Sequence, residues 1–150
     1  MSLDLFLVRF ENGEPAGYPR SLLLEIFSKY DPGKEDDGFL SPEYPDGSRV
    51  NIVYDDDAVL ANAEDDTING VMFGHWAGDQ FLDDLFEMLK RSGGALVWPG
   101  DSWAVADASL IPHMLKDLLD SRGPPIVVSS VDELFSAINA DIRKQNENRG

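Results

Sequence analysis

Residues 79–106 read DQFLDDLFEMLKRSGGALVWPGDSWAVA, and they hold the clearest pattern in the chain. Their first half places apolar side chains on one face of a helix, and two glycines then end that helix. Their second half contains two short apolar runs, 95–98 and 103–106, which a Pro-Gly turn joins into a hairpin. Strands joined by short turns and interleaved with helices are typical of an α+β domain with a mixed or antiparallel sheet.

Similar patterns continue on both sides of this stretch. Asn12-Gly13 ends a first strand with a turn, Asp79 is expected to cap the helix that follows it, and Ser130 with Glu133 forms a capping box. The expected elements are strand 3–10, helix 21–30, a short strand near 39–40, strands 49–54, 58–63 and 68–76, helix 79–92, strands 95–98 and 103–106, helix 109–120, strand 126–128 and a helix from 131. We predict one α+β domain over 1–150, of order β-α-β-β-β-α-β-β-α-β-α with about four helices, and a frayed tail over 141–150.

The composition narrows the possible functions. The 150 residues include 28 Asp and Glu against 12 Lys and Arg, which gives a net charge of −16. Free nucleic acid is not an expected partner, because binding it requires basic groups that displace counterions. Cysteine is absent, so disulfides, thiolate metal sites and cysteine nucleophiles are excluded. No apolar run approaches the roughly 18 residues that cross a bilayer, and we expect a cytoplasmic protein that does not bind membranes.

The sequence lacks the familiar motifs of catalysis and ligand binding. The only histidines are His75 and His113, and neither falls in an HExxH or His-x-His spacing. Residues 33–44 place glycine at the sixth position of a calcium loop, but Gly33 and Tyr44 stand where an EF-hand needs oxygen ligands. Nucleophile and phosphate-loop patterns are absent as well. We predict no catalytic residue, no metal site and no cofactor, and we lean towards a protein that is not an enzyme.

The most informative feature is the distribution of charge along the chain. Residues 50–89 contain ten acids and no Lys or Arg, whereas the remaining residues carry the other 18 acids and all 12 bases. Concentrated negative charge attracts a basic partner and speeds its association. Solubility alone would also explain the acids, and the sequence leaves the two interpretations open at even weight.

Tryptophan beside the acidic stretch is a candidate anchor for such a partner, since tryptophan is enriched in binding hot spots. Trp76 lies inside the stretch and Trp103 follows it, whereas Trp98 is expected in the core. The expected partner is a basic protein. The predicted partner-binding residues are Asp55, Asp56, Asp57, Glu64, Asp65, Asp66, Trp76, Asp79 and Trp103.

Together these features resemble a known group of proteins. Small, cysteine-free, strongly acidic α+β chains without catalytic signatures are similar to the immunity proteins of bacterial polymorphic-toxin and contact-dependent inhibition systems. The opening LDLFLVRFENGEP (3–15) and the closing PIVVSSVDELFSAI (125–138) also resemble an uncharacterised bacterial family. The resemblance implies an inhibitor that neutralises a toxin, often a basic nuclease, by covering its active site with acidic residues.

A second hypothesis belongs to a different class of function. A small hydrolase or divalent-metal protein would use carboxylates together with His75. It requires a cleft that brings His75 near Asp79 or Asp101, and the local sequence His75-Trp76-Ala77-Gly78-Asp79 motivates it. We favour the protein-binding hypothesis, because the base-free acidic stretch is the stronger pattern. The oligomeric state stays open.

Overall fold

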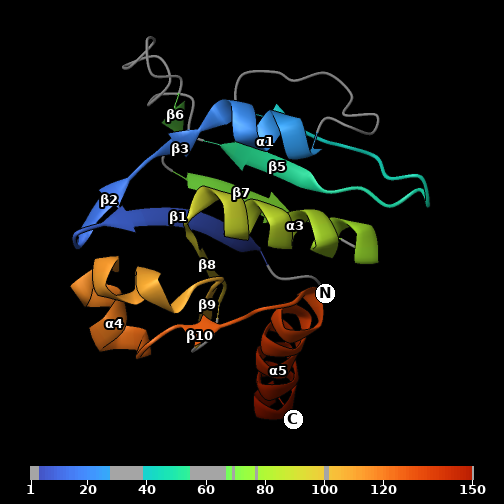
Figure 1. The fold of residues 1–150 in the computed structure, drawn as a ribbon. Coiled ribbons are helices and arrows are strands. Elements are labelled where there is room, and N and C mark those ends of the chain that lie inside the picture. Colours follow the sequence, from blue (N-terminus) through green and yellow to red (C-terminus); the bar gives the residue numbers. More distant parts are fainter. Residues whose placement is uncertain are drawn as a thin grey trace.

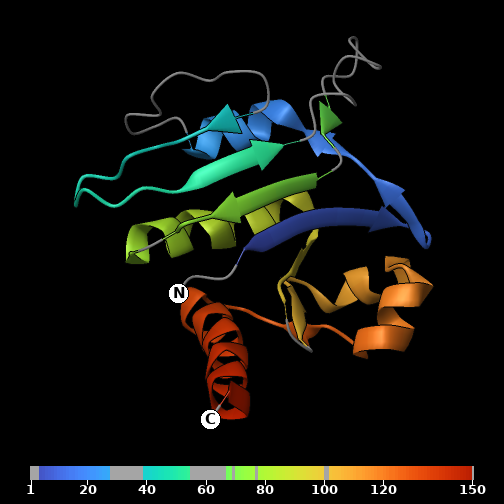
Figure 2. The same cartoon turned by 180° about the vertical axis from the view of Figure 1, so that it is seen from behind.

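The structure is a computed structural model, and it describes residues 4–27, 39–54, 67–68, 70–76, 78–99 and 102–149. In this part of the chain a mixed sheet is flanked by helices, with α1 and α3 in front of the sheet in Figure 1 and behind it in Figure 2. The sheet contains β1 (Leu5–Glu11), β2 (Glu14–Ala16), β4 (Phe39–Leu40), β5 (Asn51–Tyr54), β7 (Gly70–Gly74), β8 (Ala95–Val97), β9 (Trp103–Val105) and β10 (Ile126–Val127), and β3 (Tyr18–Pro19) pairs separately with β6 (Thr67–Ile68). The helices are α1 (Arg20–Phe27), α3 (Asp79–Ser92), the 3₁₀ helix η1 (Ala108–His113), α4 (Lys116–Arg122) and α5 (Val131–Arg149).

The sheet is built around β1, the first strand of the chain. Its strand order is β10-β9-β8-β1-β7-β5-β4, and β2 adds to β1 through the Asn12-Gly13 turn. All of these pairs are antiparallel except β9 with β10, which are parallel. Parallel neighbours need a crossover connection, and η1 with α4 supplies it. The predicted α+β domain with a mixed sheet is therefore confirmed.

The larger core lies on the face of the sheet that α1, α3 and α5 cover. Successive strand residues point to opposite faces, so Leu5 and Leu7 of β1 enter this core together with Phe73 of β7. Phe27, Phe73 and Phe81 form an aromatic cluster with ring centroids 5.4–6.3 Å apart. Each large side chain buried in this way stabilises the fold by roughly 1.5–3 kcal/mol.

A second, smaller core lies on the opposite face, at the β8–β9 end of the sheet. Phe10, Trp103 and Val105 are buried there under η1 and α4, together with Met114 from the connection between the two helices and several partly buried leucines. Further along this face, Phe6 and Val53 stay about two-fifths exposed, at 40% and 41%. Among the described residues, the helices therefore cover this face at one end only.

Helix α3 begins and ends at glycines. Gly78 occupies the N-cap with φ 87°, and Gly93 ends the helix in the left-handed conformation with φ 69°. The prediction that Asp79 is the N-cap is wrong by one residue, because the chain enters the helix through a backbone angle that favours glycine. Asp79 is the first helical residue instead, where its charge complements the helix dipole.

The helix predicted over 109–120 is two shorter helices. Pro112 lies inside η1 and has no N–H to continue the helical ladder. The chain is extended at Met114 and Leu115 before α4 begins at Lys116. The amphipathic pattern over 109–120 is therefore continuous although the helix is not. The break allows η1 and α4 to pack on the smaller core in different directions.

The last helix differs from its prediction at both ends. The Glu133 N–H donates to Ser130 Oγ as expected, but the Glu133 carboxylate accepts from Ser129 rather than from the Ser130 backbone. Residues 141–149 are helical, where fraying was expected. Asp141 explains the difference, because its buried carboxylate ties this part of α5 to the β8–β9 turn.

Candidate functional site

Phe135 is the most exposed large apolar side chain among the described residues, at 44%. Its neighbours Leu134 and Ile138 are buried against the sheet, so Phe135 lies on the outer side of the α5 stripe. A single exposed apolar residue is ordinary in a folded protein. Phe135 stands out because hollows with acidic rims lie on both sides of its helix.

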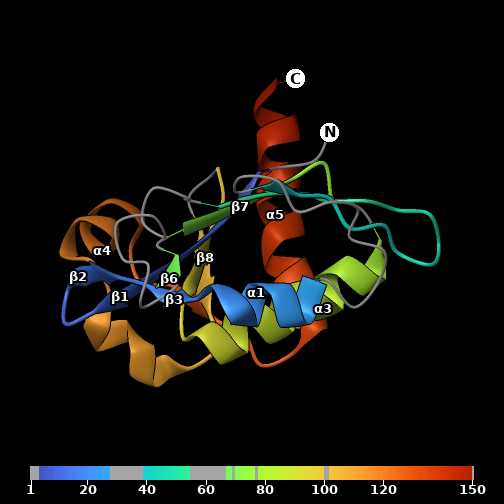
Figure 3. The same cartoon turned by 90° about the horizontal axis from the view of Figure 1, so that it is seen from above.

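The first hollow lies between the opening turns of α3 and α5. It has a volume of about 240 Å³, and Leu82, Val131 and Phe135 form its apolar lining. Three exposed acids, Asp79, Asp83 and Asp132, complete it. Figure 3 shows why two distant segments meet here, since α5 starts beside α3 and then runs away from it.

The second hollow lies between α5 and the edge strand β10. It has a volume of about 480 Å³, and Ile126 and Ala137 provide its apolar lining. Asp132, Glu133 and Ser136 provide the polar rim. We call the two hollows and the helix between them the Phe135 surface, which consists of Asp79, Leu82, Asp83, Ile126, Val131, Asp132, Glu133, Phe135, Ser136 and Ala137.

The Phe135 surface is uniformly negative. Among the described residues that line it, four are exposed acids and none is Lys or Arg. Asp79, Asp132 and Glu133 lie in first helical turns, where acids stabilise the helix dipole. Asp83 lies one turn further along α3, and its repulsion from Asp79 costs a few tenths of a kcal/mol. A cationic partner would relieve this repulsion.

The negative charge of Glu133 is stabilised by hydrogen bonds from Ser129. The backbone N–H and the hydroxyl of Ser129 each donate a hydrogen bond of 2.9 Å to its carboxylate. These bonds favour the ionised form and lower the pKa of Glu133 below its ordinary value. The rim of the second hollow therefore stays negative at neutral pH.

The predicted anchors have different positions from those expected. Trp103 is wholly buried in the smaller core and donates its Nε1–H to the Gly123 carbonyl at 2.9 Å. The prediction that Trp103 anchors a partner is therefore wrong. Trp76 is partly buried and stacks on Phe81 with ring centroids 5.6 Å apart, outside the Phe135 surface. Trp98 is buried, as predicted.

Of the predicted acids, the structure brings Asp79 to the Phe135 surface. Asp55, Asp56, Asp57, Glu64, Asp65 and Asp66 lie outside the described residues, as does the strand expected over 58–63. Sequence reasoning missed Phe135, which was assigned to the core stripe of the last helix. The available signal was its polar surroundings on that helix, with Asp132, Ser136 and Asn139 one position or one turn away.

The alternative site around His75 gains no support from the described geometry. His75 is exposed just after β7, in a left-handed conformation with φ 52°. It does not line the hollow that contains Asp79, and Asp101 lies outside the described residues. In the described ranges, no group of three or more metal-ligating side chains could hold a metal ion.

Comparisons with protein-family models, curated proteins and solved structures found no significant match. Within the described part of the chain, none of the helices combines the length and apolar character that spanning a membrane requires.

Proposed function

We propose that the protein is a non-enzymatic binding module that uses the Phe135 surface to dock a basic protein. One observation carries the proposal: a phenylalanine that is 44% exposed lines one of two hollows on either side of α5, and every charged residue described in the two linings is an acid. An apolar anchor inside a charged rim is the usual anatomy of a specific interface. The acids would steer the partner, and Phe135 would hold it.

The sequence resemblance indicates the class of partner to test first. Immunity proteins neutralise toxins, often basic nucleases, by covering the active site with acidic residues. An immunity-type inhibitor in the cytoplasm would need the net charge of −16 for fast association and an apolar anchor for slow dissociation. The acidic clusters 55–57 and 64–66 would add to the long-range field whatever their position, since they lie in the same base-free stretch.

The proposal is tested by exchanging single surface side chains. A partner is first captured from the cells that produce the protein, and its affinity is then measured for Phe135→Ala and Phe6→Ala. The two phenylalanines are similarly exposed, at 44% and 40%, but Phe6 lies on β1, outside the Phe135 surface. Losing a hot-spot anchor should weaken binding by about 2 kcal/mol, roughly thirtyfold, whereas Phe6→Ala should leave it nearly unchanged.

The charged rim is tested separately through the association rate. Asp79→Asn with Asp83→Asn removes two charges from the Phe135 surface, and Asp117→Asn with Asp120→Asn removes two exposed charges from α4. The first pair should slow association at low salt more than the second, since local charge steers the encounter. Equal effects of the two pairs, together with full binding by Phe135→Ala, would overturn the proposal.

A further inference from the structure

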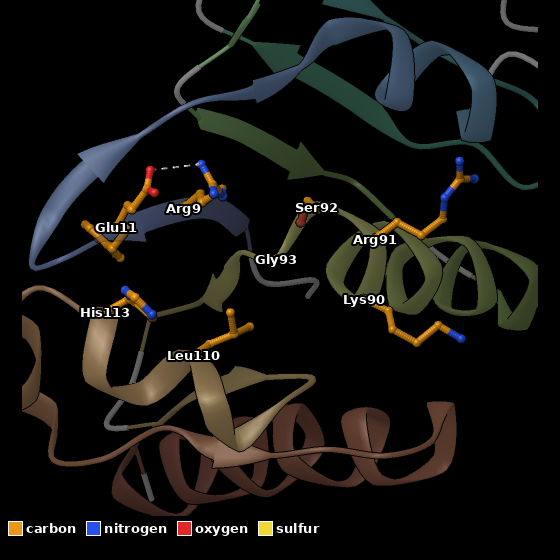
Figure 4. Close-up of a pocket in the computed structure, with 9 residues that line it drawn as sticks. Arg9, Glu11, Lys90, Arg91, Ser92, Gly93, Leu110 and His113 are labelled. Atoms are coloured by element: carbon orange, nitrogen blue, oxygen red, sulfur yellow. Dashed lines mark ion pairs between the residues drawn. The ribbon is translucent and has the colours of Figure 1, made fainter.

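The geometry points to a second site at the other end of α3: a cation-lined hollow that binds a small phosphate-type anion, either free phosphate or a phosphate monoester. The hollow has a volume of about 280 Å³ and is shown in Figure 4. This is below the usual range for drug-sized ligands, roughly 300–1,000 Å³, and it therefore suits a small group. The inference does not depend on the proposed docking surface.

The hollow has the opposite charge to the rest of the molecule. Three of the chain's 12 Lys and Arg residues and one of its two histidines line it, and Glu11 is the one acid among the described residues of the lining. Lys90 and Arg91 lie in the last turn of α3, where cations complement the helix dipole. The dipole does not explain Arg9, which comes from a strand, or His113, which comes from η1.

His113 is held with one ring nitrogen available as a donor. Its Nδ1 accepts the Asn12 N–H at 3.2 Å, and its carbonyl accepts the Gly13 N–H at 3.0 Å. In the neutral ring the proton is therefore on Nε2, which has no hydrogen-bond partner among the described residues. Two bonds to the β1–β2 turn fix this donor before any ligand arrives.

Arg9 is fixed in a similar way. Its Nη1 donates to the Gly17 carbonyl at 3.0 Å, and its side chain remains one-third exposed, at 33%. The Glu11 carboxylate forms an ion pair with the same Nη1 at 3.9 Å, which is too long for a hydrogen bond. The other guanidinium N–H groups make no hydrogen bond to the described residues. A guanidinium presents several donors in a fixed plane, which suits a phosphate group.

Gly93 keeps the space beside Arg9 open. It has a left-handed φ of 69°, and a side chain there would begin 3.8 Å from Arg9 Nε. In Figure 4, Lys90 and Arg91 point away from Arg9 and His113. Arg91 is engaged by Glu25 at 2.8 Å, and Lys90 lies 5.6 Å from the centre of the Phe86 ring. Arg9 and His113 are therefore the residues that would donate hydrogen bonds to the bound anion. Lys90 would attract the anion through its positive charge without touching it.

The test is a titration with inorganic phosphate at constant ionic strength and slightly alkaline pH, followed by NMR of the Arg9 Nε–H and His113 ring signals. Two charge-assisted contacts predict saturable binding in the millimolar range. Arg9→Gln should weaken it about tenfold. Glu11→Gln should tighten it severalfold, because the competing carboxylate is removed; a merely structural role for Arg9 predicts no such gain.

The pair Arg49 and Glu43 provides matched controls. These residues form an exposed ion pair at 3.3 Å away from the hollow, so Arg49→Gln and Glu43→Gln make the same changes in net charge without touching the site. Ethyl phosphate distinguishes the source: tighter binding than phosphate indicates a monoester, and weaker binding indicates the free ion. The inference is overturned if neither compound saturates the two signals, or if Arg9→Gln and Glu11→Gln behave like their controls.

Discussion

At the scale of single residues, Asp141 joins the last helix to the sheet. Its buried carboxylate accepts hydrogen bonds from Trp98 Nε1 at 2.7 Å and from the backbone N–H and hydroxyl of Ser102 at 3.1 and 3.3 Å. Arg122 holds the same turn from the other side, donating to the carbonyls of Trp98 and Ser102. The short β8–β9 turn is thus bound by side chains from two separate helices.

Asp141→Asn should lower the free energy of unfolding by about 1–3 kcal/mol, because an amide has one acceptor oxygen and brings an unmatched N–H₂ into a buried site. Urea denaturation followed by circular dichroism measures the change. Asp83→Asn, an exposed change on α3, should stay within about 0.5 kcal/mol. Equal stability of the two variants would show that the Asp141 bonds contribute nothing.

Gly94 is restricted by space rather than by backbone angle. An added Cβ would lie 2.6 Å from the Val8 carbonyl oxygen, in the centre of the sheet. Gly47 has φ +88° but nothing within 4 Å of such an atom. Gly94→Ala should therefore cost about 3 kcal/mol through overpacking, and Gly47→Ala only about 1–2 kcal/mol through its left-handed angle. Thermal unfolding of both variants checks this order.

At the scale of elements, the start of α5 depends on the ionised Glu133. Its pKa is lowered in the folded protein by the hydrogen bonds from Ser129, so the unfolded chain binds more protons in the carboxyl range. The stabilisation is complete above the unfolded pKa and disappears as the pH falls through the folded one.

Glu133→Gln should therefore be less stable than the natural chain at neutral pH, and the gap should narrow on acidification below the ordinary pKa of glutamate. Denaturation midpoints at a series of pH values measure the gap. Ser129→Ala should lower stability in the natural chain but have little effect in the Glu133→Gln background. A gap that stays constant with pH would contradict the assignment.

The edge strand β10 is protected against pairing with another strand. The Val128 N–H donates inward to the Val105 carbonyl, so the backbone nitrogens of alternate residues 125, 127 and 129 point away from β9. Pro125 has no N–H, and the Ser129 N–H is bonded to Glu133. Val127 is left as the one outward donor of these three, which is too little for strand addition. Docking at the adjacent hollow therefore depends on side chains.

Elements were more predictable than their junctions. The pattern of 79–106 predicted α3 and the β8–β9 hairpin, and both are confirmed because each is set by local periodicity and turn residues. Pro112 was overlooked within a strong apolar stripe, and it divides the expected helix. Asp141 was assigned to a frayed tail because its partners lie about 40 residues away in sequence, beyond any local pattern.

At the scale of the whole molecule, charge is separated along α3. Acids in its first two turns belong to the Phe135 surface, and cations in its last turn border the cation-lined hollow. The helix rises by about 15 Å over the ten steps from position 81, midway between Asp79 and Asp83, to Arg91. The sequence showed an excess of acid in 50–89, but it did not show that Asp79 and Asp83 meet Asp132 and Glu133 from the end of the chain, because only the fold brings α3 and α5 together.

The central claim is that a basic partner rests on Phe135, and photo-crosslinking tests it most directly. A photoreactive phenylalanine derivative is placed at Phe135, or at Phe6 as the equally exposed control, in cells that produce the protein. We expect one dominant crosslink from position 135 to a basic protein. This crosslink should weaken at high salt, should form more slowly with Asp79→Asn and Asp83→Asn, and should be absent from position 6. Crosslinks of equal yield from both positions, or none from position 135 while the partner is bound, would contradict it.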